Sequence, residues 1–375
     1  MAEVDIPGDD STLKSALQDV NLPNLLLVLA SITKDDHWLS ERFTPAPVEA
    51  PEGSLFPDDS GRYSAELQEE IREAAVNIIG EVRDGKRPLP PPPTVEKFQI
   101  MLSFSLAEEV NANYAAMLME ETHFQDRDEQ WRDVLNRAYA DGKAEDFNVI
   151  IIGAGMSGLG IAAKLKLAGI PFKIIEKNDQ VGGTWYENSY PDCGVDTPNH
   201  YYSYSFNRNA NWSGYFSKRD ELFSYFDDCA DAFDVRKHIS FSTEVSEARY
   251  LPDEKQWRVE TLTTEGKAEM LNASVVISAV GQLNRPATPD IKGLDTFNGE
   301  MWHSARWRSD VDLANKQVAV IGTGCSCVQL LPKTADIVDR ALVFQRTPHW
   351  VAPARDYYKP VEPGQLWALS HVPFY

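Results

Sequence analysis

Apolar side chains recur at helical spacing through the first 146 residues, and no strand pattern interrupts them. The clearest stretch begins at Ser64, a residue type that suits an N-cap, and ends at Gly85. Further helices are predicted after Asn21 and after the proline run at residues 90–93, which cannot itself continue a helix. Residues 1–146 are therefore predicted to form a helical domain. The apolar face of its clearest helix consists of Leu67, Ile71, Ala74, Ala75, Ile78, Ile79 and Val82.

The pattern changes at residue 147. Val149–Ile152 is a continuous β-branched run, which is typical of a strand buried on both faces of a parallel sheet. Val318–Ile321 is a similar run, and a glycine turn follows each of the two. These runs predict an α/β fold with two Rossmann-like units, the second inserted within the first. Further strands are predicted at Phe172–Ile175, Val275–Val280 and Ala341–Phe344, and a helix at Leu159–Leu167.

Composition narrows the classes of protein that remain. The chain has 375 residues, 43% hydrophobic and 25% charged, which excludes a disordered or fibrous polymer. Its longest apolar run, Leu25–Ile32, is much shorter than the ~20 residues that cross a bilayer, and its acidic start lacks the features of a signal peptide. The four cysteines form no C-x-x-C pair and no cluster at metal-ligand spacing. We therefore expect a cytoplasmic protein without a membrane partner, a disulfide framework or a metal site.

Charge is unevenly distributed along the chain. The net charge is −21, and residues 1–146 hold 30 Asp and Glu against 13 Lys and Arg, whereas residues 147–375 hold 27 against 23. Binding to nucleic acid depends on Lys and Arg that displace counterions from phosphates. The acidic balance therefore argues against a nucleic-acid partner, and the shift in charge places a domain boundary near Asp146.

The first glycine turn has the pattern of a dinucleotide-binding loop. Gly153 permits a tight turn, Gly155 lets backbone N–H groups approach a pyrophosphate, and Gly158 lets helix and strand pack closely. Glu176 follows 23 residues after Gly153, where a carboxylate accepts hydrogen bonds from a ribose diol. An acid here favours an unphosphorylated ribose, so FAD and NAD both remain open. A G-G-T-W motif, with small residues suited to a turn, follows at Gly182, Gly183, Thr184 and Trp185.

The second glycine turn differs from the first at its acidic position. Gly322 and Gly324 begin the motif G-T-G-C-S-C, in which Cys327 stands at the third glycine position. Gln345 lies 23 residues after Gly322, the spacing of the acid in the first unit, and Arg346 follows it. A carboxylate would repel a ribose 2′-phosphate, whereas a guanidinium binds it bidentately. This unit is therefore predicted to bind NADP in preference to NAD.

A third motif, F-x-G-x-x-x-H-x-x-x-W, lies between the two glycine turns and comprises Phe297, Gly299, His303 and Trp307. Together with both turns it resembles the fingerprint of the Baeyer-Villiger monooxygenases, a branch of the class B flavin monooxygenases. The resemblance covers residues 147–375 strongly and residues 1–146 loosely. The acidic helical extension at the N-terminus is most similar to the group typified by 4-hydroxyacetophenone monooxygenase.

The resemblance implies that the chain binds FAD and NADPH. The FAD contacts that it implies are Gly153, Gly155, Gly158 and Glu176, then Gly183, Thr184, Trp185, Asp196 and Tyr202 along the flavin, and Val245 near the adenine. The implied NADP contacts are Gly322, Thr323, Gly324, Ser326, Gln345, Arg346 and Thr347. The corresponding domains are 1–146 (helical), 147–296 (first part of the FAD domain), 297–314 (linker) and 315–375 (start of the NADP domain).

Two residues are candidates for a catalytic role through the resemblance. Asp196 is similar to an aspartate that helps to position a catalytic arginine, and the alternative is a turn residue in V-D-T-P. His303 is similar to a histidine that acts in the connection between domains, and the alternative is a core or linker side chain without a role in proton transfer. The chain departs from the family at Gly194, where an arginine is frequent, and at Arg308, where a proline is.

The implied reaction inserts one oxygen atom of O2 next to a ketone carbonyl by way of a peroxyflavin, with NADPH as the reductant. The family's catalytic arginine has no counterpart here, so we expect it to lie beyond Tyr375 in a longer enzyme and the 375-residue fragment alone to be inactive. Two alternatives remain: a flavin monooxygenase that oxygenates nitrogen or sulfur, and a helical interaction module with a vestigial nucleotide-binding unit. The helical domain is also a candidate for homodimer formation.

Overall fold

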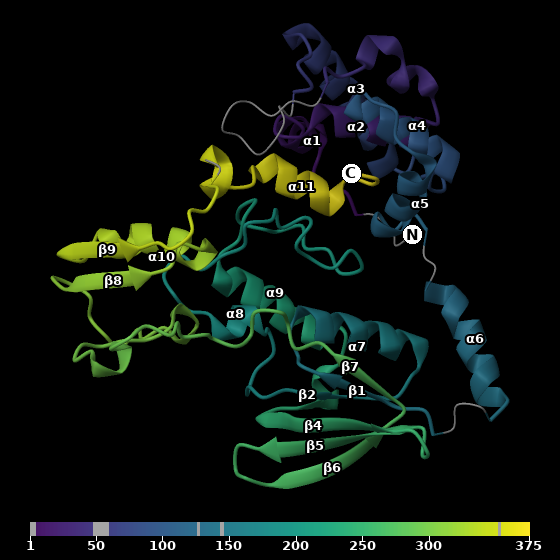
Figure 1. Ribbon diagram of the computed structural model, residues 1–375. Coiled ribbons are helices and arrows are strands. Elements are labelled where there is room, and N and C mark those ends of the chain that lie inside the picture. Colours follow the sequence, from purple (N-terminus) through teal and green to yellow (C-terminus); the bar gives the residue numbers. More distant parts are fainter. Residues whose placement is uncertain (1–4, 48–59, 126–127, 143–145, 352–353) are drawn as a thin grey trace. The chain divides into compact units, whose positions relative to one another are not determined.

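The computed structural model describes residues 5–47, 60–125, 128–142, 146–351 and 354–375 (Figure 1). The chain divides into two compact units. The first unit comprises Met1–Asp126, Thr197–Phe216 and Val351–Tyr375, and the second comprises Arg127–Asp196 and Ser217–Trp350. Each unit therefore contains segments that are distant in the sequence.

The first unit is built from helices that start at side-chain caps. Ser64 Oγ accepts the Leu67 N–H at 3.3 Å, and Asn21 Oδ1 accepts the Asn24 N–H at 2.9 Å. Both helix starts confirm the sequence-based prediction. Three further helices are capped in the same way, by Asp9, Thr94 and Asn111. The elements are α1 (Asp10–Ala16), α2 (Leu22–Thr33), α3 (Ala65–Arg83), α4 (Val95–Leu106), α5 (Ala112–Glu121) and α11 (Pro363–His371), with 3-10 turns η1 (Asp36–Leu39), η2 (Glu41–Phe43) and η6 (Arg355–Tyr358).

The core of the first unit joins two distant parts of the chain. Leu29 of α2 and Ile71 of α3 are fully buried, and Ala368 and Val372 from the other end of the sequence pack into the same cluster. The contact between α11 and α1 is close, because a Cβ on Gly364 would lie 2.1 Å from the carbonyl oxygen of the last residue of α1 (Figure 1). The apolar segment at residues 366–375 therefore completes a helical core.

A four-stranded parallel sheet, in the order β3-β2-β1-β7, forms the centre of the second unit. Val149 on the central strand β1 pairs in parallel with Phe172 on one side and with Val275 on the other. The buried β-branched run of β1 meets protein on both faces, as such runs do in parallel sheets. The predicted α/β fold with a parallel sheet is confirmed. Its strands are β1 (Val149–Ile152), β2 (Phe172–Ile175), β3 (Ile239–Ser240) and β7 (Val275–Ser278).

Helices cover one face of this parallel sheet, and an antiparallel sheet, in the order β4-β5-β6, covers the other (Figure 1). Val259 and Ala273 of the antiparallel sheet pack against Ile150 and Ile175 of the parallel one. The sequence analysis did not anticipate this second sheet. The further elements here are α6 (Asp128–Ala140), α7 (Met156–Ala168), α8 (Thr184–Glu187), α9 (Arg219–Ala232), η3 (Arg236–His238), β4 (Thr243–Leu251), β5 (Gln256–Thr263) and β6 (Ala268–Ala273).

The second glycine turn follows the first strand of a separate two-stranded sheet. Strands β8 (Gln317–Ile321) and β9 (Arg340–Phe344) pair in parallel, and α10 (Cys325–Ala335) connects them. The stretch that precedes them contains the 3-10 turns η4 (Leu294–Thr296) and η5 (Ser304–Arg306). A strand, a glycine turn, a helix and a parallel strand therefore follow one another twice within the second unit.

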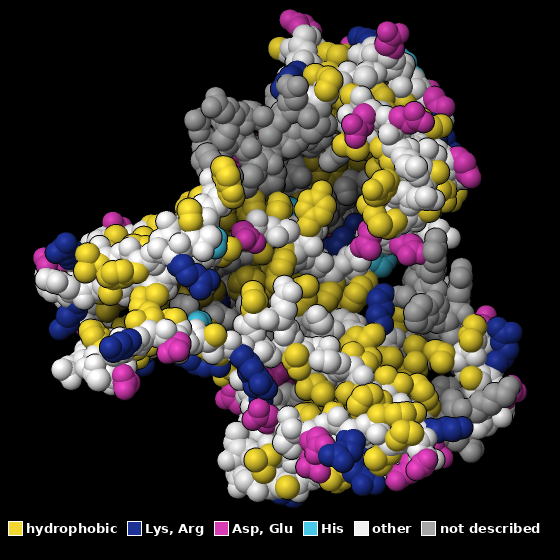
Figure 2. All heavy atoms as spheres, viewed as in Figure 1, with side chains coloured by type: hydrophobic (Ala, Val, Ile, Leu, Met, Phe, Trp, Pro, Cys, Tyr) yellow, Lys and Arg dark blue, Asp and Glu magenta, His cyan; other side chains and the backbone are white. Residues whose placement is uncertain are grey.

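The surface reflects the uneven charge of the sequence. On the face shown in Figure 2, acidic side chains are spread over the helices of the first unit. This agrees with the acidic excess of residues 1–146. Within the described parts of the chain, no helix is both long and apolar enough to cross a membrane.

Candidate dinucleotide-binding sites

The first glycine loop connects β1 to α7, and two of its three glycines leave no room for a side chain. Gly153 has φ +103°, and its N–H donates to the Ile175 carbonyl oxygen at 2.9 Å. A Cβ on Gly158 would lie only 1.9 Å from the Gly153 carbonyl oxygen. This close approach brings the start of α7 directly against the end of β1, which is the geometry of a dinucleotide-binding turn.

The G-G-T-W motif packs against the same loop. A Cβ on Gly183 would lie 3.0 Å from the Gly155 Cα, and a Cβ on Gly155 would lie 3.4 Å from the Gly183 Cα. The Gly182 N–H donates to the Ala154 carbonyl oxygen at 3.1 Å. Trp185, the last residue of the motif, is buried. The structure therefore brings together two glycine motifs that are separate in the sequence.

Glu176 holds the first loop from the end of β2. The residue is only 4% exposed. Its Oε2 accepts the Ala154 N–H at 2.6 Å, and its Oε1 accepts the Asn178 N–H at 2.9 Å. A carboxylate offers about four acceptor positions, so these two hydrogen bonds leave capacity for the hydroxyls of a ribose. The acid at the predicted spacing is thus anchored to the backbone of the glycine loop.

The second glycine loop repeats the backbone geometry of the first. Gly322 has φ +105°, and its N–H donates to the Phe344 carbonyl oxygen at 2.9 Å. Gly324 has open space where a Cβ would stand. Ser326 is half-buried in the first turn of α10, and Cys327, at the third glycine position, is buried. The loop therefore keeps the turn but packs less tightly around its glycines than the first loop does.

The rim of the second loop carries neutral and basic groups in place of a carboxylate. Gln345 Nε2 donates to Thr323 Oγ1 at 2.9 Å. The residue that follows β9 thus contacts the residue between Gly322 and Gly324, just as Glu176 after β2 contacts Ala154 in the first loop. Arg346 and Thr347 follow and are exposed. Glu176 and Gln345 thus occupy equivalent places, with a negative charge at one rim and an amide next to a guanidinium at the other.

The helices behind both loops start without a side-chain cap, because their N-cap residues are Gly155 and Gly324. By contrast, helices α1 to α5 all start at an Asp, Asn, Ser or Thr whose side chain caps the first turn. The first N–H groups of a helix have no partner within the helix and carry partial positive charge. Both loops therefore present helix N-termini that suit an anion such as a pyrophosphate.

The other candidate residues belong to different elements of the chain. Asp196 is exposed at the end of one segment of the second unit, and Tyr202 is half-buried in the first unit. Val245 lies on β4 and packs against the apolar cluster between the two sheets. Thr184 is exposed at the start of α8.

His303 caps a turn at the centre of the linking motif. Its Nδ1 accepts the Ala305 N–H at 3.1 Å at the start of η5. Because Nδ1 accepts, the proton of the neutral ring lies on Nε2. Trp302 precedes this turn and Trp307 follows it, and their rings pack edge to face against each other with 5.7 Å between centroids. These contacts give His303 a part in shaping the linker.

Glu187 is a residue that the sequence analysis did not single out. Its Oε1 accepts a hydrogen bond from Asn178 Nδ2 at 3.0 Å and lies 2.9 Å from Lys177 Nζ. Its Oε2 lies 3.7 Å from Arg306 Nη1 in the linker. The carboxylate therefore connects α8, the end of β2 and the linking motif. A single acid after a short motif has no periodicity by which the sequence could reveal this role.

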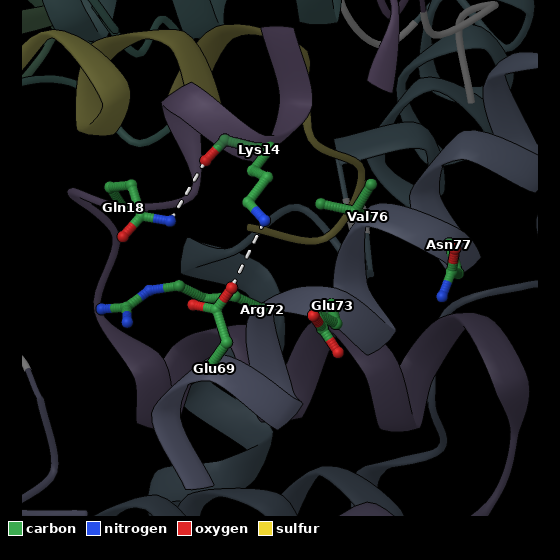
Figure 3. A pocket seen from close by; sticks show the side chains of 7 residues that line it. All are labelled: Lys14, Gln18, Glu69, Arg72, Glu73, Val76 and Asn77. Atoms are coloured by element: carbon green, nitrogen blue, oxygen red, sulfur yellow. Dashed lines mark hydrogen bonds and ion pairs between the residues drawn. The ribbon is translucent and has the colours of Figure 1, made fainter. Parts of the chain in front are cut away.

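The first unit contains a hollow of about 280 Å³ that is lined by Lys14, Gln18, Glu69, Arg72, Glu73, Val76 and Asn77 (Figure 3). Lys14 Nζ lies 3.4 Å from Glu69 Oε1, and Arg72 Nε donates to the Leu17 carbonyl oxygen at 3.2 Å. The cations of the hollow are thus engaged by the protein, and none of the candidate residues lines it. No group of three His, Cys, Asp or Glu residues in the described ranges could hold a metal ion.

These features define an α/β protein with glycine loops of the nucleotide-binding kind. The chain belongs to the flavin-binding monooxygenase-like family, whose sequence profile matches residues 146–359. The resemblance to flavin monooxygenases is therefore confirmed at the level of the family.

Baeyer-Villiger monooxygenases are among the relatives of this chain. An uncharacterised monooxygenase of Sinorhizobium fredii is 36% identical over 97% of this chain and 53% of its own length. A Baeyer-Villiger monooxygenase of Streptomyces coelicolor is 45% identical over 56% of this chain and 40% of its own length. A crystal structure of OTEMO complexed with FAD and NADP is 36% identical, with a TM-score of 0.55, over 60% of this chain and 43% of that one. The chain thus spans about half or less of the length of these proteins.

The two loops are expected to respond differently to an added methyl group. Gly158→Ala places its Cβ against the Gly153 carbonyl oxygen and is expected to lower the free energy of unfolding by about 1–3 kcal/mol. In Gly324→Ala the added Cβ meets open space, and φ −73° at this residue suits an alanine. This variant is expected to change the free energy of unfolding by less than about 0.5 kcal/mol. Chemical denaturation of the protein without added nucleotide measures both values. Equal losses in the two variants would contradict this assignment of the close contact.

Proposed function

We propose that this chain provides the nucleotide-binding part of an FAD- and NADPH-dependent monooxygenase that inserts one oxygen atom of O2 next to a ketone carbonyl. The observation that carries the proposal is the pair of equivalent glycine loops, one with Glu176 at its rim and the other with Gln345 and Arg346. The activity is proposed for the whole protein, because the chain spans only part of the length of its relatives.

FAD is assigned to the first loop. The uncapped start of α7 at Gly155 suits its pyrophosphate, and Glu176 has acceptor capacity for a ribose that bears no phosphate. Gly183, packed against Gly155, leaves the backbone open to a close approach of the cofactor. The further contacts proposed along the flavin are Thr184, Trp185, Asp196 and Tyr202, with Val245 near the adenine.

NADPH is assigned to the second loop. The uncapped start of α10 at Gly324 suits the pyrophosphate, while Thr323 and Ser326 supply hydroxyls beside it. Arg346 and Thr347 are exposed at the rim, where a guanidinium can bind a 2′-phosphate bidentately. Gln345 is already tied to Thr323 and adds no negative charge. These features favour NADPH over NADH.

When bound together, NADPH and FAD supply a hydride donor and a flavin that activates O2. The protein has to orient the two cofactors and exclude water. Asp196 is proposed to help position a cationic side chain of the whole protein near the reacting oxygen. His303 is proposed to act through the geometry of the linker rather than by proton transfer, since its Nδ1 accepts the Ala305 N–H and so caps the turn at η5.

We propose that the whole protein has the four domain ranges that the sequence indicates. Residues 1–146 form the helical N-terminal domain, 147–296 the first part of the FAD domain, 297–314 the linker and 315–375 the start of the NADP domain, with a Rossmann-like fold for each nucleotide. We assign the protein to the type of 4-hydroxyacetophenone monooxygenase because of its acidic helical extension. The relative from Sinorhizobium fredii supports a shared extension, since the match includes 97% of this chain.

The proposed activity can be tested on the full-length protein. We expect the purified protein to carry FAD and, with NADPH under 18O2, to convert aryl or cyclic ketones into esters or lactones that contain one 18O atom. A matched thioether provides the control, since selective turnover of the thioether would indicate a sulfur-oxygenating enzyme instead. Failure to take up FAD would indicate the non-enzymatic helical module.

The choice of NADPH can be tested at Arg346. We expect Arg346→Ala to raise the dissociation constant of NADPH about 10- to 100-fold, because it removes charge-assisted hydrogen bonds of about 1.5–3 kcal/mol, and to leave that of NADH unchanged. Arg340→Ala, at the exposed start of β9, removes the same charge and is the matched control. Equal losses for both nucleotides, or for both variants, would contradict the role of Arg346.

We also propose that the helical domain forms a homodimer. Large apolar side chains are exposed on two packed helices: Ile100 of α4 is 56% exposed, and Tyr114 and Met117 of α5 are 61% and 51% exposed. We expect sedimentation analysis to give twice the chain mass for the wild type and the single mass for Tyr114→Glu combined with Met117→Glu. Met270→Glu, equally exposed on β6, is the control that should remain dimeric. A monomeric wild type would contradict the proposal.

A further inference from the structure

Gln329 on α10 forms a two-sided contact with the backbone of a distant residue. Its Nε2 donates to the Gly194 carbonyl oxygen at 2.9 Å, and its Oε1 accepts the Gly194 N–H at 3.4 Å. A primary amide has one donor side and one acceptor side, so it can pair with a peptide group as a neighbouring strand would. The side chain of Gln329 therefore takes the place of a β-strand partner for Gly194.

The opposite edge of the same segment is paired with real backbone. Gly194 forms an isolated antiparallel bridge with Lys218. The Val195 N–H donates to the Ser217 carbonyl oxygen at 3.1 Å, and the Arg219 N–H donates to the Cys193 carbonyl oxygen at 2.7 Å. Residues 193–195 are thus held between residues 217–219 on one side and the Gln329 amide on the other.

Glycine is required at residue 194 by this arrangement. A Cβ there would lie 2.9 Å from the Ser217 carbonyl oxygen and 3.0 Å from Lys218 Cδ. A side chain at this residue does not fit without a shift of the backbone. Gln329 consequently recognises Gly194 through its peptide groups alone.

Tyr190 fixes the orientation of the Gln329 amide. The Tyr190 hydroxyl donates to Gln329 Oε1 at 2.9 Å. Tyr190 is buried, and burial raises the pKa of its phenol, so the hydroxyl remains a neutral donor at physiological pH. With its oxygen facing two donors, the amide must direct its NH2 group at the Gly194 carbonyl oxygen. A glutamate at 329 would lack that donor and would place one oxygen against another.

We propose that Gln329 is a positioning residue that holds the segment ending at Asp196 against the helix behind the second glycine loop. The inference rests on the proposed function, in which the first loop carries FAD and the second carries NADPH. The contact fixes how the flavin-side segment lies relative to α10. Hydride transfer from NADPH oxidises the nicotinamide and reduces the flavin, and its rate depends steeply on the distance between the two rings. A misplacement of about 1 Å can cost about 100-fold in rate.

The test compares three variants of the full-length holoenzyme. We expect Gln329→Glu and Gln329→Met to lower the rate constant of flavin reduction by NADPH about 10- to 100-fold. FAD content, the dissociation constant of NADPH and the reoxidation of dithionite-reduced flavin by O2 should stay within about 3-fold, because neither loop itself is altered. Lys333→Gln, exposed one turn further along α10, is the matched control. An unchanged reduction rate in the first two variants, or a joint loss of FAD and NADPH binding, would overturn the proposal.

A second measurement examines the contact without cofactors. In Gln329→Met, the amide of Gly194 should exchange with deuterium at least about 10-fold faster than in the wild type, because its acceptor is lost, while the amide of Val195 keeps its partner Ser217. Unchanged exchange at Gly194 would overturn the proposal. If the wild type takes up no FAD, the proposed function fails together with the role in hydride transfer, and the exchange measurement still decides whether Gln329 holds this segment.

Discussion

The close approach of Gly158 to the Gly153 carbonyl oxygen is the contact on which the first site depends. With a Cβ at 1.9 Å from that oxygen, any other residue would push α7 away from β1. The approach aims the uncapped first turn of the helix at the space beyond the strand ends, and it leaves Gly155 beside Gly183 with no side chain between them. Glu176 adds a further hold on the loop through the Ala154 N–H.

The second loop has the same backbone geometry as the first but carries different charges at its rim. Gly153 and Gly322 have nearly equal φ angles, and each donates its N–H to the last residue of the neighbouring strand. The residue after that strand then reaches back to the loop as a carboxylate, Glu176, or as an amide, Gln345. A carboxylate at the rim repels a ribose 2′-phosphate, whereas a guanidinium attracts it, so the two rims favour different riboses. The chemical difference between the sites is thus carried by a few side chains on one shared frame.

The sequence predicted five of the parallel strands to within two residues, but it missed the two-residue strand β3 and the whole antiparallel sheet. Strands such as Val149–Ile152 are buried on both faces and read as continuous apolar runs next to glycines. Strand β4 should alternate, but its pairing with β5 shifts register between Val245 and Glu247, and this irregularity breaks the period of two. Several of its side chains are also exposed and charged, so no apolar stripe marks the strand.

Contacts of single residues across long stretches of sequence lie beyond any periodic pattern. The glycine spacings indicated that Glu176 and Gln345 directly follow the neighbouring strands, because a strand, a turn and a helix of ordinary length determine where the next strand ends. Nothing comparable connects Gln329 with Gly194, which are 135 residues apart, or Ala368 with the core around Leu29. In the first case a side-chain amide recognises a peptide group, and every residue offers one. Such a contact is specified only when the fold brings α10 beside this segment, and the crowding against Ser217 that excludes a side chain at residue 194 is likewise a property of the folded backbone.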